Sequence, residues 1–237
     1  MTARQVVSTF LVLIATLASS VDGRPASPQT ARATRKLTPI DAARHDASLR
    51  TLREALLKAA DAKDAARLLP LLASQVGIDY DRALTPAEVV NEINDYSPSD
   101  QTLFWQDLRE AVELGFIREG MTEACAPYII FQLEERALSD AEPIGIVAAG
   151  VNVRREPSVT APIIDRLSYD VLEAGPEEPR PAQPGQFGGQ YRWRQVRTPK
   201  GDLGWVVSKY LRGGGDRGFC FKKEHGRWKL TSWAVGD

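Results

Sequence analysis

The chain has 237 residues, of which 43% are apolar and 26% charged, a composition typical of a globular protein with room for one large or two small domains. Thirty basic against thirty-one acidic side chains give a formal net charge of -1, so no overall field favours nucleic acid or an anionic membrane surface. Any partner must therefore be selected by a local surface.

The first twenty residues have the pattern of a secretory signal peptide. Arg4 is the single early charge, an apolar run extends from Val6 to Ala18, and Ser19 and Ser20 follow it. The run is too short to span a bilayer comfortably, and no Cys follows it that would carry a lipid. The pattern predicts residues 1–20 as a signal peptide and a periplasmic or secreted protein without a stable membrane anchor after cleavage; a retained anchor is the alternative.

The composition of residues 21–45 predicts a disordered linker. The segment has no apolar periodicity and contains Pro25, Pro28 and scattered Ser, Thr, Arg and Ala. From Asp46 the spacing becomes helical. The apolar positions recur every three or four residues at Leu49, Leu52, Ala55, Leu56, Ala59 and Ala60. Asp64 is a suitable cap for a second short helix through Leu72, and Val76 to Tyr80 alternate as a short strand.

Two further helices have clear start signals. Thr85-Pro86-Ala87-Glu88 has the residues of a capping box with Pro in the first turn. Ser97 or Ser99 is suited to cap the next helix, which should end at Gly115.

The next apolar run, Ala126 to Leu133, reads as a strand. At the far end, 218–221 and 227–235 form two strand-like runs around Gly226, which predicts a hairpin. A lone hairpin is marginally stable in water, so we expect it to dock beside the strand near Tyr128. The amino-acid sequence of this hairpin resembles the last hairpin of cone-shaped α+β proteins of the nuclear-transport-factor and ketosteroid-isomerase type.

Between these parts, five short strand-like runs suggest a small β-barrel. They are 151–154, 162–167, 170–174, 192–197 and 204–207, and a Pro/Gly-rich loop at 177–189 interrupts them. In the first run Val151 and Val153 should point into a core, while Asn152 and Arg154 point out.

These residues resemble the bacterial SH3 domain over about 147–212, with the long loop from Pro176 to Gln190 as a departure. The resemblance is carried by Val151, Asn152, Val153, Arg154, Pro157, Ser158, Trp193, Val196, Gly201, Gly204, Trp205, Val206, Tyr210 and Leu211. It implies an exported protein, often linked to cell-wall enzymes, whose module binds peptidoglycan or peptides. The predicted architecture is α+β: a host of residues 46–141 plus 214–237, with an SH3-like β-barrel, 144–212, inserted in it.

Cys125 and Cys220 bracket the barrel, and export would allow them to form a disulfide; two buried thiols are the alternative. A cysteine peptidase dyad of Cys125 and His225 is disfavoured, since Cys125 precedes a strand and not a helix that would lower its pKa. His45 and His225 lack a third metal ligand. We therefore expect no catalytic residues, no metal and no cofactor.

A recognition surface is the favoured functional prediction. Its candidate ligand-binding residues are Arg154, Tyr191, Trp193, Trp205 and Tyr210, which combine aromatic edges with a cation. Trp205 is the one expected to be buried at least in part, because small domains need large side chains to close. The expected partner is a cell-wall fragment or a peptide. A cell-wall hydrolase and a small-molecule pocket in the cone-like host are the alternatives.

Overall fold

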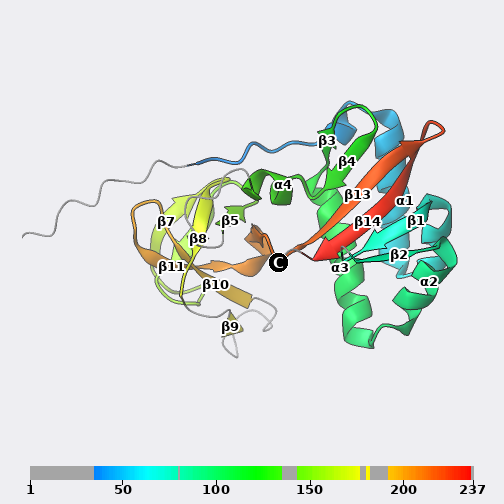
Figure 1. Ribbon diagram of the computed structural model, residues 1–237. Coiled ribbons are helices and arrows are strands. Elements are labelled where there is room, and N and C mark those ends of the chain that lie inside the picture. The colour runs from blue at the N-terminus through cyan, green and yellow to red at the C-terminus, as the bar shows by residue number, and fades with distance from the viewer. Residues whose placement is uncertain (1–34, 80, 135–142, 177–179, 182–191, 236–237) are drawn as a thin grey trace, which may run out of the picture. The chain divides into compact units, whose positions relative to one another are not determined.

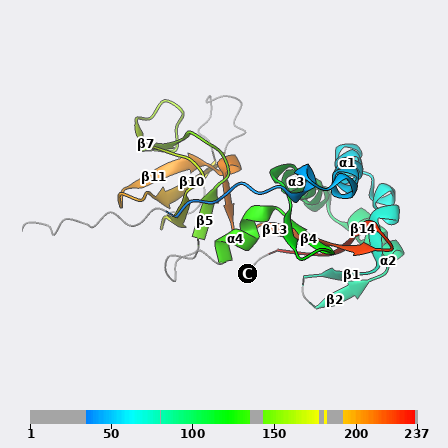
Figure 2. The same cartoon turned by 90° about the horizontal axis from the view of Figure 1, so that it is seen from above.

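The computed structural model describes residues 35–79, 81–134, 143–176, 180–181 and 192–235. The predicted signal peptide, most of the predicted linker, Tyr191 and most of the Pro/Gly-rich loop lie outside these ranges. The described strands form two sheets, and helices pack on the first of them (Figures 1 and 2). The α+β class is therefore confirmed.

The first sheet has the strand order β2-β1-β14-β13-β4-β3, with β1 parallel to β14. Its strands are β1 Leu72–Ile78, β2 Arg82–Leu84, β3 Ile117–Glu119, β4 Glu123–Ala126, β13 Arg217–Glu224 and β14 Arg227–Val235. The helices are α1 Ala47–Ala62, α2 Pro86–Asp95, α3 Pro98–Leu114 and α4 Tyr128–Glu134. Short 3₁₀ segments cover Ala42–Arg44, Ala65–Leu71 and Ser208–Tyr210.

Local capping explains where the helices begin. The Asp46 carboxylate accepts hydrogen bonds from the backbone N–H groups of Ser48 and Leu49 at the start of α1. Bonding to the Ser48 hydroxyl is the main cause that lowers the pKa of Asp46. Thr85 and Glu88 form the predicted capping box of α2, and Ser97 caps α3. These starts, and the end of α3 at Gly115, agree with the sequence predictions.

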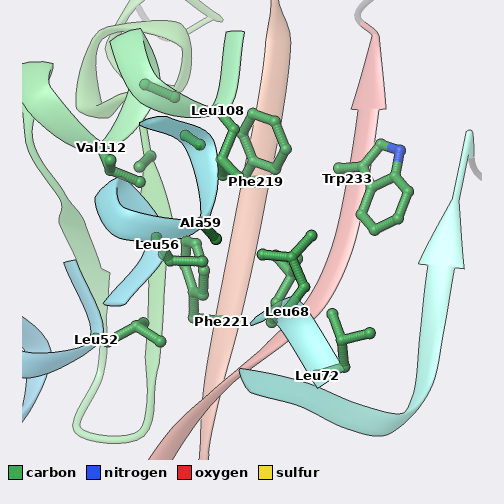
Figure 3. Packing of buried hydrophobic residues seen from close by; sticks show 14 of the residues in the cluster. Leu52, Leu56, Ala59, Leu68, Leu72, Leu108, Val112, Phe219, Phe221 and Trp233 are labelled. Atoms are coloured by element: carbon green, nitrogen blue, oxygen red, sulfur yellow. The ribbon is translucent and has the colours of Figure 1, made fainter. Parts of the chain in front are cut away.

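The main core lies between the first sheet and helices α1 and α3, which pack on one side of it (Figure 2). Four residues of the terminal hairpin belong to this core: Phe219, Phe221, Trp228 and Leu230. Figure 3 shows Phe219 and Phe221 among the leucines and alanine of the helices. The Phe104 ring of α3 packs edge-on against Phe219 and Trp233, with centroids 6.2 and 5.5 Å away. The hairpin thus docks on the first sheet, beside β4.

The predicted strand at 126–133 is wrong. Strand β4 ends at Ala126, and helix α4 begins at Tyr128. Pro127 has no N–H to continue the ladder. The following apolar run is buried as a short helix, with Ile129 and Leu133 in a cluster that also holds Leu37. A continuous apolar run suits a buried helix as well as a buried strand.

The predicted linker also ends earlier than expected. The Leu37 N–H donates to the Tyr169 carbonyl at 2.7 Å, and the Arg35 carbonyl accepts from Val171 at 2.9 Å. Leu37 and Ala43 are buried, with Ile40 packed partly against the same cluster as Leu37. Three apolar residues at intervals of three attach this segment, so residues 35–45 belong to the folded part.

The second sheet has the order β12-β5-β8-β10-β11-β6-β7, and β9 pairs with β10. Its strands are β5 Pro143–Ile146, β6 Val151–Arg154, β7 Ile163–Leu167, β8 Val171–Ala174, β9 Arg180–Pro181, β10 Arg192–Arg197, β11 Leu203–Val207 and β12 Leu211–Gly213. Pairing among the described residues leaves β12 and β7 as open edges, so a closed barrel is not seen there. Val151 and Val153 lie in the core of this sheet, as predicted.

Asp107 of α3 makes stability depend on pH. Burial raises its pKa to about 6, although Arg217 at 3.4 Å opposes this. Because the folded protein holds this proton more tightly than the unfolded chain, the contribution favours folding at low pH and is lost as pH rises through about 6. We expect Asp107→Asn to remove this pH-dependent contribution to the free energy of unfolding. Melting temperatures measured between pH 4 and 7.5 test this expectation, with Glu113→Gln at an exposed position as control. If the melting temperature of Asp107→Asn changed with pH in parallel with that of the wild type, the expectation would be contradicted.

Candidate ligand-binding surface

The second sheet carries two tryptophans on the face opposite its core. Across β10 and β11, Trp193 lies opposite Val207 and Gln195 opposite Trp205. Residues directly opposite each other share a face, and the alternate positions Val196 and Val206 belong to the core. The outer face of this sheet therefore holds both tryptophans.

Strand β6 extends this outer face. Arg154 lies opposite Trp205, so its side chain shares the tryptophan face. Asn152 alternates to the same side, and its Oδ1 accepts a hydrogen bond from Arg166 Nε at 3.0 Å. The neighbouring strand thus contributes an amide and a cation to a surface whose other members are aromatic.

A cavity of about 230 Å³ opens at this place, and we call it the β6 cavity. Its lining combines strand, turn and loop residues: Ala149, Gly150, Val151, Asn152, Arg154, Val159, Trp193, Val207 and Tyr210. Three of the five predicted binding residues, Arg154, Trp193 and Tyr210, thus come together. Trp205 lies on the same face but does not line the cavity.

Both tryptophan rings are buried, Trp193 with 1% and Trp205 with 4% of its surface exposed. Burial was expected for Trp205, whereas an exposed edge was expected for Trp193. The loop between β6 and β7 folds back toward this face and brings Val159 to the cavity beside Trp193. Sequence alternation assigns a residue to a face, but it does not reveal how deeply that residue is buried there.

The loop is held in place by its own hydrogen bonds. Arg154 donates from one guanidinium N–H to the Ala161 carbonyl at 2.6 Å, which ties the strand to the end of the loop. Within the loop, the Ser158 hydroxyl accepts from the Thr160 N–H at 3.2 Å, and the Ala161 N–H donates to the Ser158 carbonyl. Arg154 therefore has a positioning contact as well as a place in the cavity wall.

The surroundings of the cavity are rich in cations. Arg154 lies in the wall, Arg166 is held against Asn152, and the Lys209 ammonium lies 4.8 Å from the centre of the Tyr210 ring. The carboxylate of Asp165, on the neighbouring strand β7, is paired with Lys200 at 3.0 Å. This distribution favours a ligand that presents a carboxylate together with apolar groups.

Sequence reasoning did not identify six of the lining residues: Ala149, Gly150, Val151, Asn152, Val159 and Val207. The alternation of β6 already placed Asn152 outside the core, so its position was accessible from the sequence. Val159 lies in a loop with no periodicity, and no local signal identified it.

The cysteines form a disulfide. Cys125 of β4 lies directly opposite Cys220 of β13, with Cα atoms 4.1 Å apart. The bond joins the two strands between which the second sheet is inserted in the sequence. It also removes the Cys125 thiolate on which a dyad with His225 would depend.

In the described ranges, no group of three or more His, Cys, Asp and Glu side chains is placed to hold a metal ion. None of the helices described here is long and apolar enough to cross a membrane. No family model, no curated protein and no solved structure matches the chain.

Proposed function

We propose that the chain is an exported, non-enzymatic binding protein of the bacterial cell envelope. In this proposal residues 144–212 are an SH3-type module inserted in the α+β host. The β6 cavity of this module recognises peptidoglycan or a peptide by binding the carboxylates and apolar side chains of that ligand. The observation that carries the proposal is the meeting of Arg154, Trp193 and Tyr210 around one cavity.

The chemistry of the wall suits an extended peptide. Val207 and the rings of Trp193 and Tyr210 offer apolar contact, while Asn152 and Arg154 offer polar groups. Arg154 already donates one hydrogen bond to Ala161. A guanidinium has five N–H donors in a planar fork, so Arg154 retains the capacity to take a carboxylate.

Two observations support export. The pattern of residues 1–20 is typical of a signal peptide, and the disulfide suits an oxidising compartment. Mass spectrometry of envelope-purified protein should find the N-terminus near residue 20; an intact N-terminus would contradict cleavage.

Binding is tested with purified sacculi and with soluble stem peptides. We expect Arg154→Ala and Tyr210→Ala each to weaken peptide binding by about tenfold or more, in line with the loss of a charge-assisted hydrogen bond or an aromatic contact. Arg155→Ala is the matched control, because Arg155 is exposed and does not line the cavity. Wild-type protein that neither sediments with sacculi nor binds stem peptides would refute the proposal.

A further inference from the structure

A cleft of about 760 Å³ lies beside helix α3, and we call it the α3 cleft. One part of its wall is a stripe of α3 residues at helical spacing: Leu103, Asp107 and Glu110. Most of the remaining wall comes from β10, from the 3₁₀ segment and β12 that follow β11, and from the start of β13. Among the described residues, the α3 cleft and the β6 cavity have no lining residue in common. The volume lies in the range of small-molecule pockets, about 300 to 1,000 Å³.

Charged side chains line much of the α3 cleft. Of the described residues in its wall, five are basic and three acidic: Arg192, Arg194, Lys209, Arg212, Arg217, Asp107, Glu110 and Asp216. The cleft therefore has a formal charge of +2 when every group is ionised, in a chain whose net charge is -1. Other lining residues offer apolar contact: Leu103, Ala111, Pro127 and Leu211. This composition favours an organic anion over a cationic ligand.

Two of the three carboxylates are bound within the protein. Glu110 is paired with Arg212, whose side chain is only 12% exposed. The Asp216 carboxylate accepts a hydrogen bond from the Gly213 N–H at 2.8 Å. Within the part of the chain that the structure describes, the acidic side chains of the cleft do not form a group placed to hold a metal ion. A cationic ligand would therefore have to displace partners that these carboxylates already have.

The third carboxylate, Asp107, holds its arginine less firmly. Arg217 Nε lies 3.4 Å from Asp107 Oδ2, yet this buried nitrogen has no hydrogen-bond partner among the described residues. Burial is the main cause that raises the pKa of Asp107 to about 6. The charges of Asp216 and Glu110 add to this rise, and those of Arg217 and Arg212 oppose it. The Asp107–Arg217 pair is therefore a part of the cleft that changes near pH 6.

We propose that the α3 cleft is a second binding site, which takes an organic molecule with two or more oxyanionic groups. The cations come from separate strands, with Arg194 on β10 and Arg217 on β13. A ligand with several anionic groups engages more of them than a single small ion does. A guanidinium presents five N–H donors in a planar fork that matches carboxylate and phosphate oxygens. The contacts that these arginines already make therefore do not exhaust their donors.

Acidic conditions should strengthen binding at this site. As the pH falls through about 6, Asp107 gains a proton, which removes a negative charge from the cleft and ends its ionic pairing with Arg217. Burial also raises the pKa of Asp216, so its protonation acts in the same direction. A ligand whose own charge stays constant should therefore bind more tightly at pH 5 than at pH 7.5.

The probe for the experiment is ethane-1,2-disulfonate, because both of its groups stay ionised between pH 5 and 7.5. In an NMR titration of the ¹⁵N-labelled full chain, we expect saturable shifts of the backbone amides of Lys209 and Gly213, which line the cleft. Binding should be about threefold or more tighter at pH 5 than at pH 7.5. Ethylenediamine, which has the same carbon spacing but positive charges, should not bind. Succinate and pyrophosphate at pH 7.5 then show whether the cleft prefers carboxylates or phosphates.

Variants assign the binding to the α3 cleft. Arg194→Ala and Arg217→Ala should each weaken disulfonate binding about fivefold or more, because each removes charge-assisted hydrogen bonds. Asp107→Asn should bind more tightly than the wild type at pH 7.5 and lose most of the pH dependence, which a purely structural role of Asp107 would not produce. Arg155→Ala, at an exposed position outside the cleft, and Arg154→Ala in the β6 cavity should bind like the wild type.

One further variant guards against a loss of folding. The Arg217 guanidinium lies 5.7 Å from the centre of the buried Phe104 ring, so its removal also changes packing. Arg192 is exposed in the same cleft, and Arg192→Ala should weaken binding without lowering the melting temperature. Cleft amides that respond to none of the three anions, ethylenediamine that binds as tightly as the disulfonate, wild-type binding by all three arginine variants, or binding that tightens as the pH rises would overturn the proposal.

Discussion

Removal of the Cys125–Cys220 disulfide is expected to lower the free energy of unfolding by about 4 to 5 kcal/mol. The bond closes a separation of 95 residues, which includes the whole second sheet. In the chain-entropy model, the loss of such a long cross-link increases the freedom of the unfolded chain. Urea denaturation of the Cys125→Ala/Cys220→Ala double variant, compared with the oxidised wild type, measures the difference.

Alanine is the better replacement because Cys125 is buried in β4 and a serine hydroxyl would need a partner there. The wild type under reducing conditions should unfold at nearly the same urea concentration as the double variant. A loss below about 1 kcal/mol would mean that the unfolded chain holds the two strands together without the bond.

Phe219→Ala should cost about 3 to 5 kcal/mol, the range for a fully buried Phe truncated to Ala. Phe219 has no exposed surface and packs edge-on against Phe104 of α3. The substitution leaves a cavity at the place where the terminal hairpin meets the helices, and neighbouring rings can fill it only in part. Thermal and urea unfolding of the full chain give the value.

Lys222→Ala is the matched control, since Lys222 lies on the same strand but is exposed on the opposite face. Its surface ion pair with Glu123 at 2.9 Å should contribute less than about 1 kcal/mol. A loss from Phe219→Ala no larger than that of the control would show that the hairpin does not stabilise the first sheet.

Both predictions concern the same junction. Strand β4 precedes the second sheet in the sequence and β13 follows it, yet the two strands pair with each other. The disulfide and the buried side chains of the hairpin therefore both stabilise the place where the chain leaves the first sheet and returns to it.

Several features could be predicted from the sequence because their causes are local. The Thr85 capping box, the Ser97 cap and the two-residue turn at His225 and Gly226 depend on side chains within three or four residues of each other. The facing of Val151 and Val153 follows from the period of a strand. For the candidate site, this alternation placed Arg154 and Asn152 outside the core.

Other features were decided only by the tertiary structure, because contacts far apart in the sequence outweigh local patterns. Residues 126–133 suit a strand or a buried helix equally, and the cluster with Leu37 selects the helix. Sequence alone left open whether the two cysteines are free thiols or a disulfide, and the pairing of β4 with β13 places them opposite each other, where they form the bond. Likewise, only long-range packing brings a strand, a loop and a turn together around the β6 cavity, with the loop residue Val159 and the strand residue Trp193 both in its wall.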